Sequence, residues 1–253
     1  MPEPLSSAAG PSEMVTEGRR MAKAIDDAGI DARLFGGIAI ALQCHIARSG
    51  RLQRTYADLD VIVKRRAAGA LSDVMVDLGY RPAERFNTLH GRARLLFESD
   101  VTHVDVFVNQ FEMCHFLDLG GRLDVVPFTL PLADLLLTKL QVAELNLKDV
   151  SDASAILIDH DLTPDDTGIN LTRCVSLLAS DWGWWRTATE NIGKIENLAT
   201  ELGLDAPQII RLKEQRAALS TAIEEAPKTM RWRARAKVGE RVAWRNDPEE
   251  VAH

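Results

Sequence analysis

The stretch Asp58-Leu59-Asp60-Val61-Ile62-Val63 decides the fold, because its residues alternate in the manner of a β-strand. Successive side chains of a strand point to opposite faces, so Asp58 and Asp60 project from one face and the apolar residues between them from the other. The β-branched residues and the basic boundary at Lys64 favour the same assignment. Two carboxylates on one strand face are close enough to share hard divalent cations.

A third aspartate, Asp105, lies in a second apolar strand, predicted over His103–Asn109. If this strand pairs beside Asp58–Val63, three carboxylates converge, and their mutual repulsion is relieved by cations. The pattern predicts two Mg²⁺ ions, with Mn²⁺ as the alternative, held by Asp58, Asp60 and Asp105. The other interpretation is that the two strand aspartates simply face solvent. His103 shares a strand face with Asp105, but we assign no histidine a role.

Gly36-Gly37 lies between a short apolar run, Ala32–Phe35, and a helical pattern over Ile38–Ala47. Glycine lets the backbone approach a phosphate, and the start of a helix supplies N–H groups and a positive dipole end. Gly-Gly alone is more often just a turn. Gly-Gly at a strand–helix junction, followed by an Asp-x-Asp strand, is a much narrower pattern.

Lys139 lies near the centre of an apolar stripe on a helix predicted over Leu132–Leu147. A lysine rarely occupies such a stripe without an anionic partner, and a triphosphate or one of the aspartates would serve. The alternative is a lysine whose amino group reaches the rim of the stripe.

The remaining elements predict an α+β fold: a small mixed β-sheet core with helices, followed by an all-helical C-terminal domain. We divide the chain into a mobile tail (1–14), a first domain (15–162) and the helical domain (163–253). The elements expected besides those above are helices over 15–28, 67–78, 149–159, 172–182, 184–202, 206–225 and 228–245, a strand over 93–97, and a hairpin of 116–118 and 123–126 around Gly120-Gly121.

Composition excludes several classes of protein. No segment approaches 18 uninterrupted apolar residues, so no membrane span is expected. Three widely spaced cysteines show neither metal-ligand spacing nor a disulfide framework, and we expect a cytoplasmic protein. The net charge of −7 argues against a general nucleic-acid coat protein.

The basic segment Lys228–Arg245 is an exception to this acidity. It contains seven cations and one acid and so carries +6, which leaves −13 for the rest of the chain. Its interleaved Trp232 and Trp244 suit phosphate contacts and base stacking. The alternative is a solvated or dimer-forming helix whose tryptophans belong to the core.

Together these motifs resemble the DNA polymerase beta-type nucleotidyltransferase superfamily, and within it the AbiEii-like toxins and related mycobacterial nucleotidyltransferase toxins. The matching positions are Gly36-Gly37, Arg54-Thr55-Tyr56-Ala57-Asp58-Leu59-Asp60, Asp105, Leu135-Leu136-Leu137-Thr138-Lys139-Leu140 and Lys148-Asp149-Val150-Ser151-Asp152. The chain departs from the family pattern in the longer link from Gly37 to Asp58. The serine common after the first glycine is absent, so any hydroxyl contact to phosphate must come from elsewhere.

The resemblance implies a nucleotidyltransferase catalytic domain over 15–162 that transfers a nucleotide from a nucleoside triphosphate to an acceptor hydroxyl. It suggests an RNA or tRNA 3′ end as acceptor, and an antitoxin protein as a partner. Asp149 and Asp152 are expected either to orient Lys139 or contact the nucleotide, or else to lie on a helix surface. A small-molecule, antibiotic-type transferase and a non-catalytic nucleotide-binding module are the competing interpretations. Implied catalytic residues are Asp58, Asp60, Asp105 and Lys139; implied nucleotide contacts are Gly36, Gly37, Thr55, Lys139, Lys148, Asp149 and Asp152.

Overall fold

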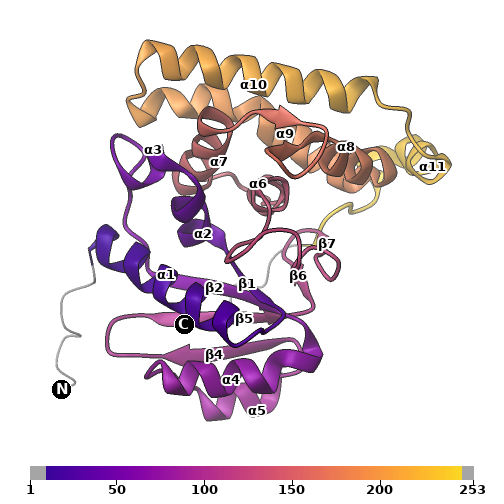
Figure 1. The fold of residues 1–253 in the computed structure, drawn as a ribbon. Coiled ribbons are helices and arrows are strands. Elements are labelled where there is room, and N and C mark those ends of the chain that lie inside the picture. The colour runs from indigo at the N-terminus through magenta and orange to yellow at the C-terminus, as the bar shows by residue number, and fades with distance from the viewer. Residues whose placement is uncertain (1–9, 247–253) are drawn as a thin grey trace, which may run out of the picture. The chain divides into compact units, whose positions relative to one another are not determined.

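A computed structural model describes residues 10–246, and the chain divides into two compact units (Figure 1). The first comprises residues 1–111 and 118–131, and the second comprises 112–117 and 132–253. The predicted α+β class is confirmed, with a small mixed sheet in the first unit and helices in the second. The predicted catalytic region 15–162 extends over both units, and its boundaries stay a prediction. Of the predicted tail, residues 1–9 lie outside the described part of the chain.

The five-stranded sheet of the first unit has the order β1-β2-β5-β4-β3. Strand β2 pairs in parallel with β5, and the other neighbours are antiparallel. The strands are β1 (Ala32–Phe35), β2 (Asp58–Val63), β3 (Arg81–Pro82), β4 (Arg94–Glu98) and β5 (His103–Val108). The parallel pair at the centre aligns the two aspartate-bearing strands.

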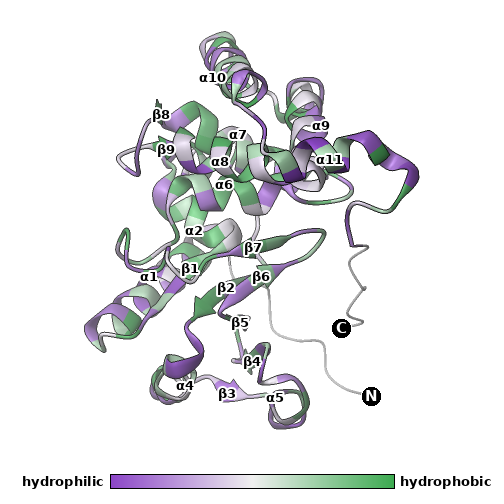
Figure 2. Cartoon of the chain, turned by 90° about the vertical axis from the view of Figure 1, so that its right-hand side faces the viewer, coloured by the Kyte–Doolittle hydropathy of each residue, from purple (hydrophilic) through white to green (hydrophobic). Residues whose placement is uncertain are grey.

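Alternation gives this sheet one apolar and one partly polar face. On the apolar face, Leu59 and Val61 of β2 lie beside Val104 and Val106 of β5, and all four are fully buried. Figure 2 shows α1 (Pro11–Asp27) and α4 (Ala68–Asp77) on one side of the sheet and α5 (Glu84–His90) on the other. Gly18 lets α1 approach closely, because a Cβ there would lie 2.3 Å from an Ile38 methyl group.

The predicted first helix begins earlier than expected, at Pro11 rather than residue 15, because Met14 belongs to its buried stripe together with Met21 and Ile25. Proline at the first helical position has no N–H to leave unsatisfied. The other helices of this unit are α2 (Gly36–Gln43), α3 (His45–Arg48) and the single 3₁₀ turn η1 (Arg65–Ala67).

The second unit is helical apart from short strands. Its elements are α6 (Leu132–Leu140), α7 (Leu147–Asp159), α8 (Leu171–Ser180), α9 (Trp182–Leu198), η2 (Ala199–Leu202), α10 (Ala206–Glu225), α11 (Met230–Val238), η3 (Gly239–Arg241) and the parallel pair β8 (Leu162–Thr163) and β9 (Ile169–Asn170). The helix predicted over 228–245 is shorter in the structure, where α11 ends at Val238. Among the described residues, no helix combines the length and the apolar character that crossing a membrane requires.

The single helix predicted over Leu132–Leu147 is wrong, because α6 ends at Leu140 and α7 begins at Leu147. The Asn191 amide donates to the carbonyl oxygens of Leu140 and Val142, at 3.0 and 2.8 Å. The Asn146 side chain accepts the Asp149 N–H and thereby caps α7. Asn191 and Asn146 thus supply hydrogen bonds that a continuous helix would have formed within itself between the end of α6 and the start of α7.

The predicted hairpin around Gly120-Gly121 is also wrong. Strand β7 (Phe116–Asp118) pairs with β6 (Gln110–Glu112), and residues 121–128 form turns and bends. The Asp118 carboxylate accepts the Gly120 N–H at 3.0 Å, which turns the chain directly after the strand.

His115 is buried in a hydrogen-bond chain of the second unit. Its Nε2 lies 2.8 Å from Thr187 Oγ1, which also accepts the Trp244 indole N–H at 3.3 Å. The Thr187 hydroxyl thus lies between the imidazole and the indole, and these contacts hold His115 in the interior. Burial lowers the pKa of His115 to about 4; Asp181 raises it and Arg245 lowers it further.

We expect the free energy of unfolding to fall as the pH drops from about 6.5 to 4, because the unfolded chain then takes up a proton that folded His115 does not. The contribution of His115 to the free energy of unfolding is complete above about pH 6.5 and amounts to about 3 kcal/mol. Urea unfolding at about pH 7 and 4.5 measures it. The fall in unfolding free energy between these two pH values should be smaller in His115→Gln. It should be unchanged in His45→Gln, which replaces an exposed histidine and serves as the control. Equal losses in wild type and His115→Gln would contradict this assignment.

Candidate metal centre and phosphate-binding turn

Strands β2 and β5 bring their acidic residues together. The parallel register places Asp60 beside Asp105 and Asp58 beside His103. Side chains at paired positions of neighbouring strands project from the same face, so these four share the polar side of the sheet. The condition on which the sequence analysis depended, that the two strands are neighbours, is therefore met.

Asp58, His103 and Asp105 form a group that could hold a metal ion. Each offers one ligand atom, and these atoms lie within 4.8 Å of one another. His103 Nε2 is 3.9 Å from Asp58 Oδ2, and both side chains are partly exposed, whereas the Asp105 side chain is only 7% exposed. Carboxylates fit Mg²⁺ or Mn²⁺, and the imidazole adds a ligand that later transition metals prefer. The group thus offers a divalent ion two carboxylates at a site open to solvent.

Arg94 of β4 holds the buried carboxylate of this group. Its Nε donates to Asp105 Oδ1 at 2.9 Å, and its Nη2 forms an ion pair with the same oxygen at 2.8 Å. The guanidinium lies over the ring of Phe107, 5.2 Å from the centroid, with Phe86 at 6.0 Å. The ion pair fixes the orientation of the Asp105 carboxylate and offsets part of the negative charge of the face. No local feature of the sequence indicates a role for Arg94, because the pairing of β4 with β5 depends on residues distant in sequence.

Asp60 lies against the strand–helix turn. Strand β1 ends at Phe35, which pairs with Asp60, and Gly36 follows with a φ of 69°. A Cβ on Gly36 would lie 2.0 Å from Asp60 Oδ2. Only glycine therefore accommodates both the backbone conformation and the carboxylate. The metal-binding role predicted for Asp60 stays a proposal.

Gly37 makes room for a cation rather than a carboxylate. A Cβ there would lie 2.2 Å from Arg54 Nη2 and 3.1 Å from the Tyr56 ring. The Arg54 guanidinium lies 4.5 Å from the centre of the Tyr56 ring, and its Nη1 donates to the carbonyl of exposed Thr55. The two glycines thus bring an acidic and a basic side chain close to the start of α2. Their predicted contact with phosphate stays a prediction.

No protein family matches this sequence, and no curated protein matches it. The search of solved structures finds a likeness to the antibiotic-resistance factor ANT(2'')-Ia, determined in solution. The two chains are 16% identical, and the match covers 91% of this chain and 99% of that one, with a TM-score of 0.36.

The motif predicted around Lys139 lies in the second unit. Lys139 Nζ is 2.9 Å from Asp152 Oδ2 and 3.3 Å from Asp149 Oδ1, and the Asp152 side chain is 2% exposed. Asp149 and Asp152 are therefore not helix-surface residues; both are buried and form ion pairs with the lysine. Lys148 is exposed. Contacts of these four residues with a nucleotide stay a prediction.

His103 should set the preference of the site among divalent ions. Imidazole favours Mn²⁺ over Mg²⁺, because its nitrogen is a softer ligand than a carboxylate oxygen and Mg²⁺ is the harder cation. We expect His103→Asn to weaken Mn²⁺ binding about tenfold, which is the size of effect seen when a residue that supports a metal ligand is removed. Mg²⁺ binding should weaken much less. Calorimetric titration of each ion measures this, with His90→Asn as an exposed control in the same unit. Equal weakening for both ions would show that His103 supports the fold only.

Proposed function

We propose that this chain is a divalent-metal-dependent nucleotidyltransferase. It would transfer a nucleoside monophosphate from a nucleoside triphosphate to an acceptor hydroxyl. The observation that supports the proposal is the grouping of Asp58, His103 and Asp105 on two parallel strands, with Asp60 against a glycine turn that opens a helix. Carboxylates beside such a turn suit a cation-bound triphosphate.

Asp58, Asp60 and Asp105 are proposed to hold two Mg²⁺ ions, with Mn²⁺ as the alternative. Bound there, the ions would neutralise triphosphate charge and acidify the acceptor hydroxyl. Asp105 would accept the hydroxyl proton through the oxygen that Arg94 does not bind. The acceptor oxygen bonds to the α-phosphorus, the bond to the bridging oxygen breaks, and pyrophosphate leaves.

The remaining contacts of this proposal follow from the motif resemblance. The N–H groups of Gly36 and Gly37 would bind phosphate oxygens and Thr55 would contribute a hydroxyl. By the same resemblance, Lys139 would neutralise phosphate charge while Asp149 and Asp152 orient it. Lys148 is proposed as a further nucleotide contact.

The finer proposal takes the acceptor to be the 3′ end of an RNA such as tRNA. This follows the motif resemblance to nucleotidyltransferase toxins, which also implies a cytoplasmic toxin with an antitoxin partner. Expression in a bacterial host should then arrest growth, and the Asp58→Asn variant should not.

The direct test supplies each α-³²P-labelled nucleoside triphosphate in turn, together with Mg²⁺ and total cellular RNA. Label should appear on RNA with one preferred nucleotide, and it should be absent with Asp58→Asn. Label on a small molecule alone would refute the RNA acceptor and retain the transfer chemistry. Label incorporation by Asp58→Asn at the wild-type rate would refute the proposed metal centre.

A further inference from the structure

The turn after β1 opens α2 with a residue that cannot cap it. The N-cap position is occupied by Phe35, which has no side-chain oxygen to accept the N–H groups of the first helical turn. Gly36 and Gly37 are the first two residues of α2, and the Asp60 carboxylate lies against the first of them. Open N–H groups favour an anion there, whereas the carboxylate repels one. The capacity of this turn to bind an anion therefore depends on a cation close to it.

Arg54 supplies that cation. An ideal Cβ on Gly37 would lie 2.2 Å from Arg54 Nη2 and 3.2 Å from its Cζ, so the guanidinium fills the place that a side chain at residue 37 would take. The φ of Gly37 does not lie in the left-handed region, and glycine is required there by space alone. The serine common at this position of the motif is thus replaced in space by a guanidinium.

Neighbouring groups fix the orientation of Arg54. Its Cζ lies 4.5 Å from the centre of the Tyr56 ring, and its Nη1 donates to the Thr55 carbonyl at 3.0 Å. The Tyr56 side chain is itself buried, and its hydroxyl donates to the Ala47 carbonyl at 3.4 Å. A guanidinium presents its N–H donors in a planar fork that matches two phosphate oxygens, and an orientation fixed beforehand costs less entropy on binding. Arg54 is therefore a pre-oriented phosphate ligand.

Other arginines near the polar face of the sheet serve different contacts. Arg48 donates to two backbone carbonyl oxygens of α2, and Arg94 binds the Asp105 carboxylate. Arg51 belongs to the same loop as Arg54 but is exposed. Of these four arginines, Arg54 is the one whose guanidinium lies against the glycine turn.

The basic segment Lys228–Arg245 of the second unit uses much of its charge internally. Three of its cations lie over tryptophan rings, 4.7–5.9 Å from the ring centres: Lys228 over Trp232, Arg235 over Trp182 and Arg245 over Trp244. Arg235 also donates to backbone carbonyl oxygens within the segment. These contacts account for the two tryptophans of the segment, and its predicted phosphate contacts stay a prediction.

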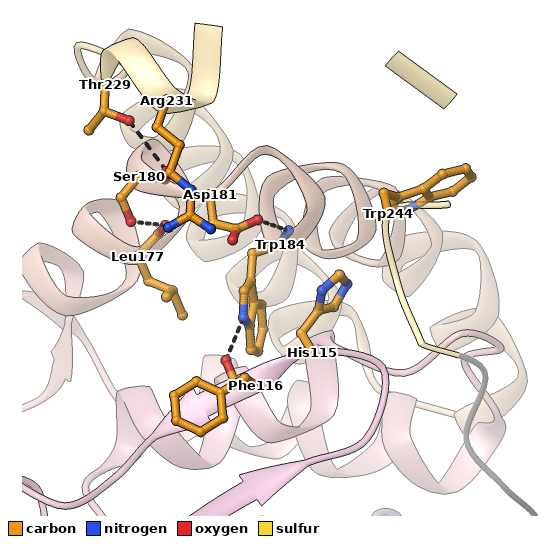
Figure 3. Close-up of a pocket in the computed structure, with 9 residues that line it drawn as sticks. All are labelled: His115, Phe116, Leu177, Ser180, Asp181, Trp184, Thr229, Arg231 and Trp244. Carbon is orange, nitrogen blue, oxygen red and sulfur yellow. Dashed lines mark hydrogen bonds between the residues drawn. The ribbon is translucent and has the colours of Figure 1, made fainter. Parts of the chain in front are cut away.

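A cavity of about 520 Å³ in the second unit is lined by groups that are engaged with one another (Figure 3). The hydroxyls of Ser180 and Thr229 donate to backbone carbonyl oxygens at 2.8 and 3.3 Å. Figure 3 shows Arg231 beside the Asp181 carboxylate, whose charge repels an anion. This cavity therefore suits a phosphate less well than the turn at Gly37.

We propose that Arg54 binds the β- and γ-phosphates of the nucleoside triphosphate. Its guanidinium and the first N–H groups of α2 would hold the part of the substrate that leaves, while the carboxylates of β2 and β5 hold the metal ions at the α-phosphate. When the bond from the α-phosphorus to the bridging oxygen breaks, its electron pair stays on that oxygen, and the guanidinium stabilises the charge of the departing pyrophosphate. The inference rests on the proposed function, because it takes the triphosphate to bind at this turn.

Calorimetric titration of the full chain with Mg²⁺-tripolyphosphate tests the contact without a nucleoside, so no nucleotide is transferred. Arg54→Gln should raise the Kd about tenfold or more, the effect expected when hydrogen bonds between charged groups are lost. Arg54→Lys keeps the charge but not the planar fork, and its Kd should lie between those of wild type and Arg54→Gln. Arg51→Gln removes an exposed cation from the same loop and should change the Kd less than twofold.

Gly37→Ala displaces the guanidinium without replacing Arg54. Alanine suits the helical backbone at residue 37, and the groups near its added methyl are the flexible end of Arg54 and the Tyr56 ring. The Kd should rise about as much as in Arg54→Gln. The double variant should bind no more weakly than the weaker single variant, because both changes remove one contact. Circular dichroism establishes that each variant is folded.

Three results would overturn the inference: tripolyphosphate binding by Arg54→Gln equal to wild type, losses that add in the double variant, or loss of Mn²⁺ binding by Arg54→Gln in the absence of tripolyphosphate. The last would show that Arg54 supports the metal centre instead. In all three cases wild type still binds tripolyphosphate, and the proposed function stands. A wild type that binds no tripolyphosphate would remove the triphosphate site on which the proposed function itself depends, so the two failures are distinguishable.

Discussion

Replacing Asp105 by asparagine is expected to lower nucleotide transfer on the order of 10³-fold, a loss of about 4 kcal/mol in transition-state stabilisation. Asparagine keeps the shape of the side chain and can still accept a hydrogen bond from Arg94. It removes the negative charge that a divalent ion requires and the oxygen that would take the acceptor proton. Steady-state transfer from labelled nucleoside triphosphate, with the fold monitored by circular dichroism, measures the effect.

Asp100→Asn is the matched control for this prediction. Asp100 belongs to the same unit and forms an exposed ion pair with Arg81, so its loss should leave transfer within about twofold of wild type. If Asp105→Asn also retains more than about a tenth of the wild-type rate while remaining folded, Asp105 is not part of the reaction centre.

Gly36→Ala is expected to abolish measurable transfer, because the added Cβ would meet Asp60 Oδ2 at 2.0 Å. Either Asp60 or the turn must move, and each change separates the carboxylate from the strand face it shares with Asp105. The positive φ of 69° adds strain of about 1–2 kcal/mol for any residue with a Cβ. Transfer activity and thermal unfolding, measured on the same preparation, separate the two effects.

Gly29→Ala is the control that separates the backbone strain at a positive φ from the steric clash with Asp60. Gly29 has a φ of 62°, close to that of Gly36, but nothing lies within 4 Å of its ideal Cβ. It should therefore lose a similar amount of stability and retain transfer. Loss of activity to the same degree in both variants would show that destabilisation, and not displacement of Asp60, explains the effect of Gly36→Ala.

Local patterns predicted the elements that carry the candidate site. Strand Asp58–Val63 has the predicted bounds because its residues alternate strictly, and the short apolar run Ala32–Phe35 forms a strand with the bounds predicted for it. The second aspartate strand differs by one residue. The prediction that Asp58 and Asp105 converge depended on the two strands being neighbours. The sheet order confirms that they are.

The partners of these residues depend on contacts between distant parts of the sequence. Arg94 pairs with Asp105 because β4 lies antiparallel to β5 in one particular register, which no local signal specifies. The end of α6 at Leu140 depends on Asn191, some fifty residues later. The alternation that placed Asp105 also placed His103 on the same face, but only the pairing with Asp58 shows that it belongs to the group.

The central claim is that the carboxylates of β2 and β5 bind a divalent cation. Electron paramagnetic resonance of Mn²⁺ titrated into the full chain tests it most directly, with and without nucleoside triphosphate. The account predicts bound Mn²⁺ in wild type, tighter binding with triphosphate, and loss of both in the Asp58→Asn/Asp105→Asn variant. Equal Mn²⁺ binding by the wild type and that folded variant would contradict the account.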